Sequence, residues 1–182
     1  MSARGIPTIH KSRRYRSRLE AKWAAFFDLL GWHAEYEPFD CDGWIPDFAI
    51  TTSTGFVLVE VKPITMPSPD IYEKIDVANT DCYGVLLVGL SPFESRQDGA
   101  SPGSAAIGWY SPSPKSGWIE SNLAVRKPLF DFYSRSGGGI RLHVIGRDQR
   151  AHDEEGAFLT SHIVPATTIW SNACNSVQWR RT

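Results

Sequence analysis

The sequence predicts an α/β fold built on a mixed sheet. A helical pattern near the N-terminus is followed by apolar runs joined by short polar turns, which is typical of strands and of a β-hairpin. A second helical segment then separates this hairpin from another apolar run, and a strand–helix–strand connection favours parallel pairing. The expected order is helix, three strands, helix and strand, with an α+β extension at the C-terminal end.

Composition bounds the class of protein. The chain has 182 residues, 42% of them hydrophobic, which is enough for one domain with a proper core. It shows no signal-peptide pattern and no apolar run of about 18 residues, so we expect a cytoplasmic protein with no membrane segment. Its three cysteines, Cys41, Cys82 and Cys174, lie far apart and indicate neither a disulfide framework nor a zinc ribbon.

Positive charge is concentrated at the N-terminus, although the formal net charge of the chain is −1. We expect residues 1–11 to form a flexible basic arm, which either contacts phosphates or only keeps the protein in solution. The basic residues that follow lie closer to the site described below, so we expect them to bind the backbone of a nucleic acid. These residues are Arg13, Arg14, Arg16 and Arg18.

The first helix is predicted from about Ser12 to Leu30, with Gly31 as its stop signal. Glu20 falls at the edge of its apolar stripe, so we expect Glu20 where the helix meets the sheet. The alternative is that Glu20 is an i,i+4 partner of Arg16 on an exposed flank. The residues of the apolar stripe are Leu19, Trp23, Phe26, Phe27 and Leu30.

Three strands are predicted after this helix. The first covers residues 32–39, and a turn at residues 40–43 separates it from a hairpin within residues 44–63. We leave the acids of that turn out of the site, because Asp and Gly in turns mostly serve backbone geometry. Pro63 ends the hairpin, since proline cannot donate a ladder hydrogen bond.

The hairpin brings two acids and a lysine together. If it closes symmetrically about Ser53-Thr54, Asp47 lies opposite Glu60, and Lys62 shares the face of Glu60. Two carboxylates inside an otherwise apolar sheet repel each other, and a divalent cation between them would remove that cost. The alternative, an ordinary solvated strand face, does not suit a strand that is apolar on both faces. The pattern therefore indicates a metal-dependent site.

These residues resemble a known motif. Pro46-Asp47, followed after a hairpin by Glu60-Val61-Lys62, is similar to the motif of the PD-(D/E)XK nuclease superfamily, and residues 16–24 resemble the leading helix of its phage and bacterial members. The resemblance implies a restriction-endonuclease-like α-β-β-β-α-β core over residues 12–90, with residues 91–182 packed on it as an extension within a single domain. It further implies a Mg²⁺-dependent DNA endonuclease encoded by a phage or mobile element.

The resemblance also implies a role for each residue of the site. Asp47 and Glu60 would bind Mg²⁺ or Mn²⁺ directly, with the carbonyl of Val61 as a further ligand. Glu20 would bind a second metal or hold a metal-bound water. Lys62 would position the attacking water and offset charge on the phosphate.

The rest of the chain is predicted with less detail. Ser68-Pro69 begins a second helix that runs to about Thr80 and buries Ile71, Ile75 and Ala78, and residues 83–90 form a buried strand. Residues 118–133 are ambiguous. Further predictions are a loop at 91–104, an edge strand at 105–110, a loop at 111–117, strands at 140–145 and 157–164, and a final helix at 165–180 that buries Ile169, Ala173 and Val177.

Other classes of function stay open at this point. One is a non-catalytic DNA-binding subunit of a transposition or recombination complex, which has no need to bind metal. Another is an endonuclease subunit that is inactive without its partners. Cleavage of both strands of a duplex would favour a homodimer. A purely structural α/β protein would leave the paired acids unexplained.

Overall fold

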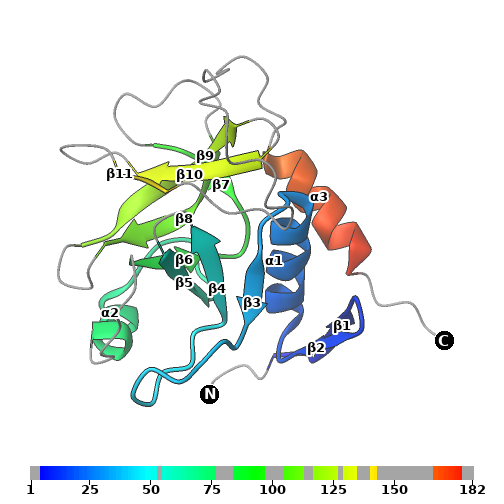
Figure 1. Cartoon of the computed structure of the whole chain (residues 1–182), viewed down its shortest axis with the longest axis horizontal. Coiled ribbons are helices and arrows are strands. Elements are labelled where there is room, and N and C mark those ends of the chain that lie inside the picture. The colour runs from blue at the N-terminus through cyan, green and yellow to red at the C-terminus, as the bar shows by residue number, and fades with distance from the viewer. Residues whose placement is uncertain are drawn as a thin grey trace.

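The computed structural model is a mixed α/β structure in which helices cover both faces of a twisted sheet (Figure 1). The helices are α1 (Arg18–Leu29), α2 (Pro69–Asp76) and α3 (Ala166–Ser176). A separate hairpin consists of β1 (Thr8–His10) and β2 (Arg13–Tyr15). The structure describes residues 5–52, 55–76, 84–96, 105–112, 117–126, 129–134, 140–142 and 166–177.

The described strands of the main sheet follow the order β11-β10-β9-β8-β6-β5-β4-β3, with β7 paired to β8. Of the adjacent pairs, β5 and β6 are parallel and the others are antiparallel. The predicted mixed sheet is therefore confirmed. The strands are β3 (Ala34–Tyr36), β4 (Phe48–Thr52), β5 (Gly55–Val61), β6 (Val85–Val88), β7 (Phe93–Glu94), β8 (Ala105–Ser111), β9 (Ile119–Arg126), β10 (Leu129–Ser134) and β11 (Ile140–Leu142).

The first helix is shorter than predicted, and its expected start at Ser12 is wrong. Lys11 and Ser12 have φ values of 46° and 65°, which form the tight turn between β1 and β2. The helix begins only after Ser17, whose side-chain oxygen accepts a hydrogen bond from the backbone N–H of Glu20 at 3.1 Å. The segment expected as a flexible arm thus contributes β1 to a hairpin that packs beside α1. The end of the helix is as predicted, with Gly31 at a φ of 75°.

The register predicted for the hairpin of β4 and β5 is confirmed. Ala49 pairs with Leu58 and Thr51 with Phe56, so successive residues of β5 point to opposite faces. The valines at every second position of β5 lie in the core beneath α1 and α3. Leu58, on the opposite face, packs in a second core that includes Ile75 of α2. The strand is therefore buried on both faces, as its sequence indicated.

The second helix and the following strand are found where they were predicted, but β6 ends at Val88 rather than Leu90, and Ile71 is only half-buried. The backbone N–H of Ile71 donates to the carbonyl of Ser68, and Ile75 is buried. The predicted end of this helix, with Ala78 and Thr80, lies outside the described residues. The four residues of β6 are buried, and this strand runs parallel to β5. The order of helix, three strands, helix and strand is confirmed.

The strand predicted at residues 105–110 is not an edge strand. Its counterpart β8 lies between β6 and β9, and a β-bulge occurs between Ala106 and Gly108. A Cβ atom at Gly108 would lie 2.2 Å from the carbonyl oxygen of Leu87, so glycine allows β8 to approach β6 closely. The loop predicted at residues 91–104 contains the short strand β7. The strand predicted at residues 157–164 lies outside the described residues.

The final helix lies beside α1 on one face of the sheet (Figure 1). Ile169, Ala173 and Val177 are buried, as predicted. Trp170 packs against Trp23, with their ring centroids 4.7 Å apart. This contact joins α3 to the first helix. The predicted end of this helix, from residue 178 onward, lies outside the described residues. Within the described part of the chain, no helix is both long and apolar enough to cross a membrane.

Candidate metal-dependent active site

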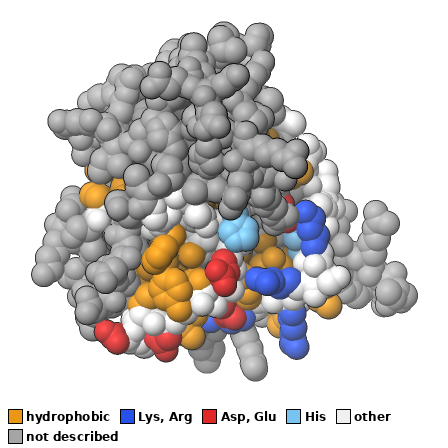
Figure 2. All heavy atoms as spheres, in the orientation of Figure 1, with side chains coloured by type: hydrophobic (Ala, Val, Ile, Leu, Met, Phe, Trp, Pro, Cys, Tyr) orange, Lys and Arg blue, Asp and Glu red, His pale blue; other side chains and the backbone are white. Residues whose placement is uncertain are grey.

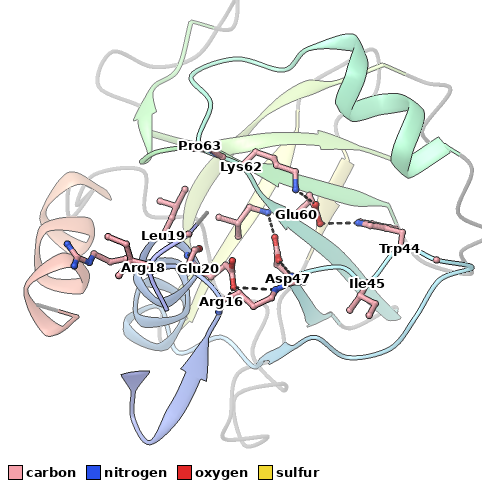
Figure 3. A pocket seen from close by; sticks show the side chains of 15 residues that line it. Arg16, Arg18, Leu19, Glu20, Trp44, Ile45, Asp47, Glu60, Lys62 and Pro63 are labelled. Carbon is pink, nitrogen blue, oxygen red and sulfur yellow. Dashed lines mark hydrogen bonds and ion pairs between the residues drawn. The ribbon is translucent and has the colours of Figure 1, made fainter. Parts of the chain in front are cut away.

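A pocket of about 800 Å³ opens where the start of α1 meets the ends of the β4–β5 hairpin (Figure 3). Its charged residues come from three segments: the turn into α1, the residue before β4, and the end of β5. The structure thus brings together side chains that lie more than 40 residues apart in the chain. The charged lining residues are Arg16, Arg18, Glu20, Asp47, Glu60 and Lys62.

Asp47 lies immediately before β4 and is only 4% exposed. Its Oδ2 accepts a hydrogen bond from the backbone N–H of Val61 at 2.8 Å, and its Oδ1 accepts one from Nη2 of Arg16 at 2.7 Å. Burial, and then the carboxylate of Glu60, raise the pKa of Asp47 well above its ordinary value; the Val61 N–H and Lys62 act in the opposite direction. A buried carboxyl with a raised pKa is a group for which a further cation would be favourable.

Glu60 is the second acid of the pocket and is 6% exposed. Its Oε2 accepts a hydrogen bond from Nε1 of Trp44 at 3.0 Å, and its Oε1 contacts Nζ of Lys62. Glu60 and Lys62 therefore share a face, as alternation along the strand predicted. The ladder between β4 and β5 ends at the pair Phe48–Val59, so Asp47 approaches β5 just beyond the last ladder pair.

Glu20 is also buried, at 7% exposed, and faces the pocket from the first turn of α1. Its Oε2 accepts hydrogen bonds from the hydroxyl of Tyr36 at 2.6 Å and from the backbone N–H of Arg16 at 3.1 Å. Burial and this bond to Glu20 raise the pKa of Tyr36. Glu20 thus lies where the helix meets the sheet, as predicted. The alternative of an exposed flank is wrong, although Nε of Arg16 is 4.0 Å from Glu20.

The four arginines expected to bind nucleic acid differ in their surroundings. Arg13 and Arg14 are exposed on β2, and Figure 2 shows Lys and Arg side chains on the surface over this hairpin. Arg18 points away from the acids, toward α3 (Figure 3). Arg16 instead lies among the acids, with Nε 2.9 Å from Oε1 of Glu37. Burial lowers the pKa of Arg16, but Asp47 and Glu37 outweigh it and raise that pKa above its ordinary value.

Three residues of the site were not found from the sequence: Tyr36, Glu37 and Trp44. Tyr36 and Trp44 direct their polar atoms to Glu20 and Glu60. A signal was present, because Tyr and Trp side chains that are buried or half-buried need partners for their O–H and N–H groups. Nothing in the sequence indicated which acids these partners would be.

The donor set fits a hard divalent cation with some of its waters retained. Asp47 and Glu60 offer carboxylate oxygens in one pocket, and Mg²⁺ commonly binds through one or two protein carboxylates plus waters. Among the described residues, no three His, Cys, Asp or Glu side chains form a group that could hold a metal. Direct ligation by Glu20 would therefore need a rearrangement, and ligation by the carbonyl of Val61 stays a prediction.

Comparisons of this chain with family models, curated proteins and solved structures give no match. The chemistry of the site therefore rests on its own residues and geometry.

Proposed function

We propose that the protein is a metal-dependent DNA endonuclease of the PD-(D/E)XK kind, with a restriction-endonuclease-like core. The observation that supports this most is the pair of buried carboxylates, Asp47 and Glu60, in an open pocket with the ammonium group of Lys62. Arg16 and Lys62 each pair with one of these acids, yet the pKa of Asp47 stays raised, so the cost of burying the two acids together is compensated only in part. A protein with a purely structural role would gain stability by replacing them.

In the proposed reaction, Asp47 and Glu60 hold Mg²⁺ or Mn²⁺. When bound, this ion supplies the activation of water and offsets negative charge on the phosphate. Lys62 lies beside Glu60 and donates hydrogen bonds to the attacking water or to a phosphate oxygen. Glu20 lies at the edge of the same pocket and orients a water there. Trp44 and Tyr36 hold Glu60 and Glu20 in place through their hydrogen bonds.

The substrate class is supported by the position of the basic residues. The β1–β2 hairpin carries exposed arginines, Arg13 and Arg14, and leads directly into the pocket through Arg16. Exposed Lys and Arg residues bind the phosphates of DNA with strong salt dependence. A DNA backbone that lies along the hairpin would reach the acids at the start of α1.

The test is Mg²⁺-dependent cleavage of linear, nicked, branched and single-stranded DNA by the full chain. We expect cleavage by the wild type and a loss on the order of 10³-fold in Glu60→Gln and Lys62→Met, because each removes a group that stabilises developing charge. Glu35→Gln, on the exposed side of β3, is the matched control and should keep full activity. Equal activity of wild type and Glu60→Gln would remove the assignment. Metal-independent DNA binding without cleavage would instead favour the non-catalytic subunit.

A further inference from the structure

The guanidinium of Arg16 donates a hydrogen bond to the oxygen of Asp47 through which a metal would bind. The backbone N–H of Val61, at the end of β5, donates to Oδ2 of Asp47 at 2.8 Å and fixes this oxygen beside the sheet. Oδ1 receives Nη2 of Arg16 at 2.7 Å, and Figure 3 shows Arg16 reaching across the pocket to this atom. A cation that binds Asp47 through Oδ1 therefore meets the guanidinium first.

The charges around Arg16 are those of a cation site. Its Nε lies 2.9 Å from Glu37 and 4.0 Å from Glu20, in addition to the contact with Asp47. Three acidic side chains, Glu20 and Asp47 of the pocket and Glu37 beside it, thus surround one guanidinium. This arrangement offsets part of the repulsion that the acids would otherwise exert on one another.

The side chain of Arg16 is held less firmly than its backbone. The backbone N–H donates to both Glu20 and Tyr36, so the position of Arg16 in the chain is fixed. The side chain is 56% exposed, so its guanidinium can leave Asp47 without disturbing the core. An arginine anchored in this way can exchange one anionic partner for another.

We propose that Arg16 holds the place of a divalent cation at Asp47 and leaves it when the metal binds. The released guanidinium then takes a phosphate of the bound DNA, for which its forked donors are well suited. Arg16 thereby couples metal binding to DNA binding. This inference rests on the proposed function, because it assumes that Asp47 and Glu60 bind a metal.

The first test measures Mn²⁺ binding by isothermal titration calorimetry in the wild type, Arg16→Met and Arg14→Met. Arg14 is the control, because it is exposed on the neighbouring hairpin and makes no ion pair within the described residues. We expect Arg16→Met to bind Mn²⁺ at least about 5-fold more tightly than the wild type does, which is the lower end of typical coupling between two sites. An unchanged or weaker affinity overturns the inference. An equal gain in Arg14→Met also overturns it, since general charge would then explain the effect.

The second test measures how Ca²⁺ changes the affinity for duplex DNA at several salt concentrations. Ca²⁺ should steepen the salt dependence of wild-type binding by about 0.9 in logarithmic slope, the value for one additional phosphate contact. Arg16→Met should lack this change, whereas Arg14→Met should show it. The same Ca²⁺-dependent change in Arg16→Met would contradict the transfer of the guanidinium to DNA.

The two proposals fail in different ways. If Mn²⁺ binds the wild type no better than Glu60→Gln, the metal site itself is wrong and the proposed function fails with it. If Glu60→Gln loses Mn²⁺ binding but Arg16→Met binds as the wild type does, only the role of Arg16 is wrong.

Discussion

The two ends of α1 carry similar charges but differ in how those charges are compensated. Glu20 near the start and Asp28 near the end are eight residues apart, which is about 12 Å along a helix. Each lines a pocket, of about 800 Å³ at the start and about 580 Å³ at the end. Each also has basic neighbours.

The difference lies in the number of buried acids that each pocket holds. Asp28 lies 3.3 Å from Nε2 of His10 and 3.1 Å from Nζ of Lys11, so a single carboxylate meets two basic side chains. At the other end, Glu20 shares its pocket with Asp47 and Glu60. We therefore expect function at the start of α1, where three acids are buried together, and none at its end.

The largest effect expected from this comparison is on cleavage. Glu20→Gln keeps an oxygen that can accept from Tyr36 but removes a negative charge from the candidate site. We expect Mg²⁺-dependent DNA cleavage to fall on the order of 10²-fold. Asp28→Asn is the matched change at the other end of the same helix and should alter cleavage less than about 2-fold, because Asp28 does not line the candidate site and lies about 12 Å along the helix from Glu20. Similar losses in both variants would mean that the two ends do not differ in function.

The parts of the site that the sequence could predict are those that depend on local rules, such as alternation along a strand and periodicity along a helix. Alternation along β5 placed Glu60 and Lys62 on one face, and helical periodicity placed Glu20 at the edge of the buried stripe. Symmetric closure gave the correct register of the hairpin, so Asp47 was expected beside the end of β5. Each of these predictions depends only on residues that lie close together in the chain.

The remaining contacts depend on the path of the backbone between elements. Glu37 and Asp42 have φ values of 47° and 51°. Residues other than glycine seldom adopt this conformation, and nothing in the sequence predicts it at these two positions. These bends direct the chain that carries Tyr36 and Trp44 to the acids. The β1–β2 hairpin was mistaken for the start of a helix, because charged residues such as Arg13 and Arg14 suit an exposed helix equally well.

The next effect is on stability, and its sign differs between the two ends. Burial and Glu60 raise the pKa of Asp47 from 3.8 to about 7. Between about pH 4 and 7 the folded state holds a proton that the unfolded state has released, so this group's contribution to the free energy of unfolding falls as pH rises. The Asp47→Asn variant has no carboxyl at this position, so its free energy of unfolding does not undergo this decrease as pH rises. We therefore expect the variant to gain stability relative to the wild type as pH rises from 4 to 8, and to be the more stable of the two at pH 8 by about 2 kcal/mol.

The measurement is urea unfolding of both proteins from pH 4 to pH 8. The figure of about 2 kcal/mol is below the roughly 4 kcal/mol that three pKa units would give, because the variant loses its contact with Arg16. Asp28→Asn should instead be less stable than the wild type at pH 8, since it loses contacts with His10 and Lys11. An Asp47→Asn variant that is less stable at pH 8 would show that Arg16 already compensates the acid in full.

The smallest effect concerns two buried tryptophans, each of which donates one indole hydrogen bond. Nε1 of Trp44 donates to Glu60 at 3.0 Å, whereas Nε1 of Trp23 in α1 donates to the carbonyl of Gly89 at 2.8 Å. Trp44→Phe should weaken Mn²⁺ binding about 10-fold, because groups that orient metal ligands have effects of this size. Trp23→Phe should lower stability and leave the affinity of the folded protein for Mn²⁺ unchanged. The measurement is calorimetric titration of both variants with Mn²⁺. If Trp44→Phe binds Mn²⁺ as tightly as Trp23→Phe, Glu60 needs no support from Trp44, and its position is set by β5 and Lys62 alone.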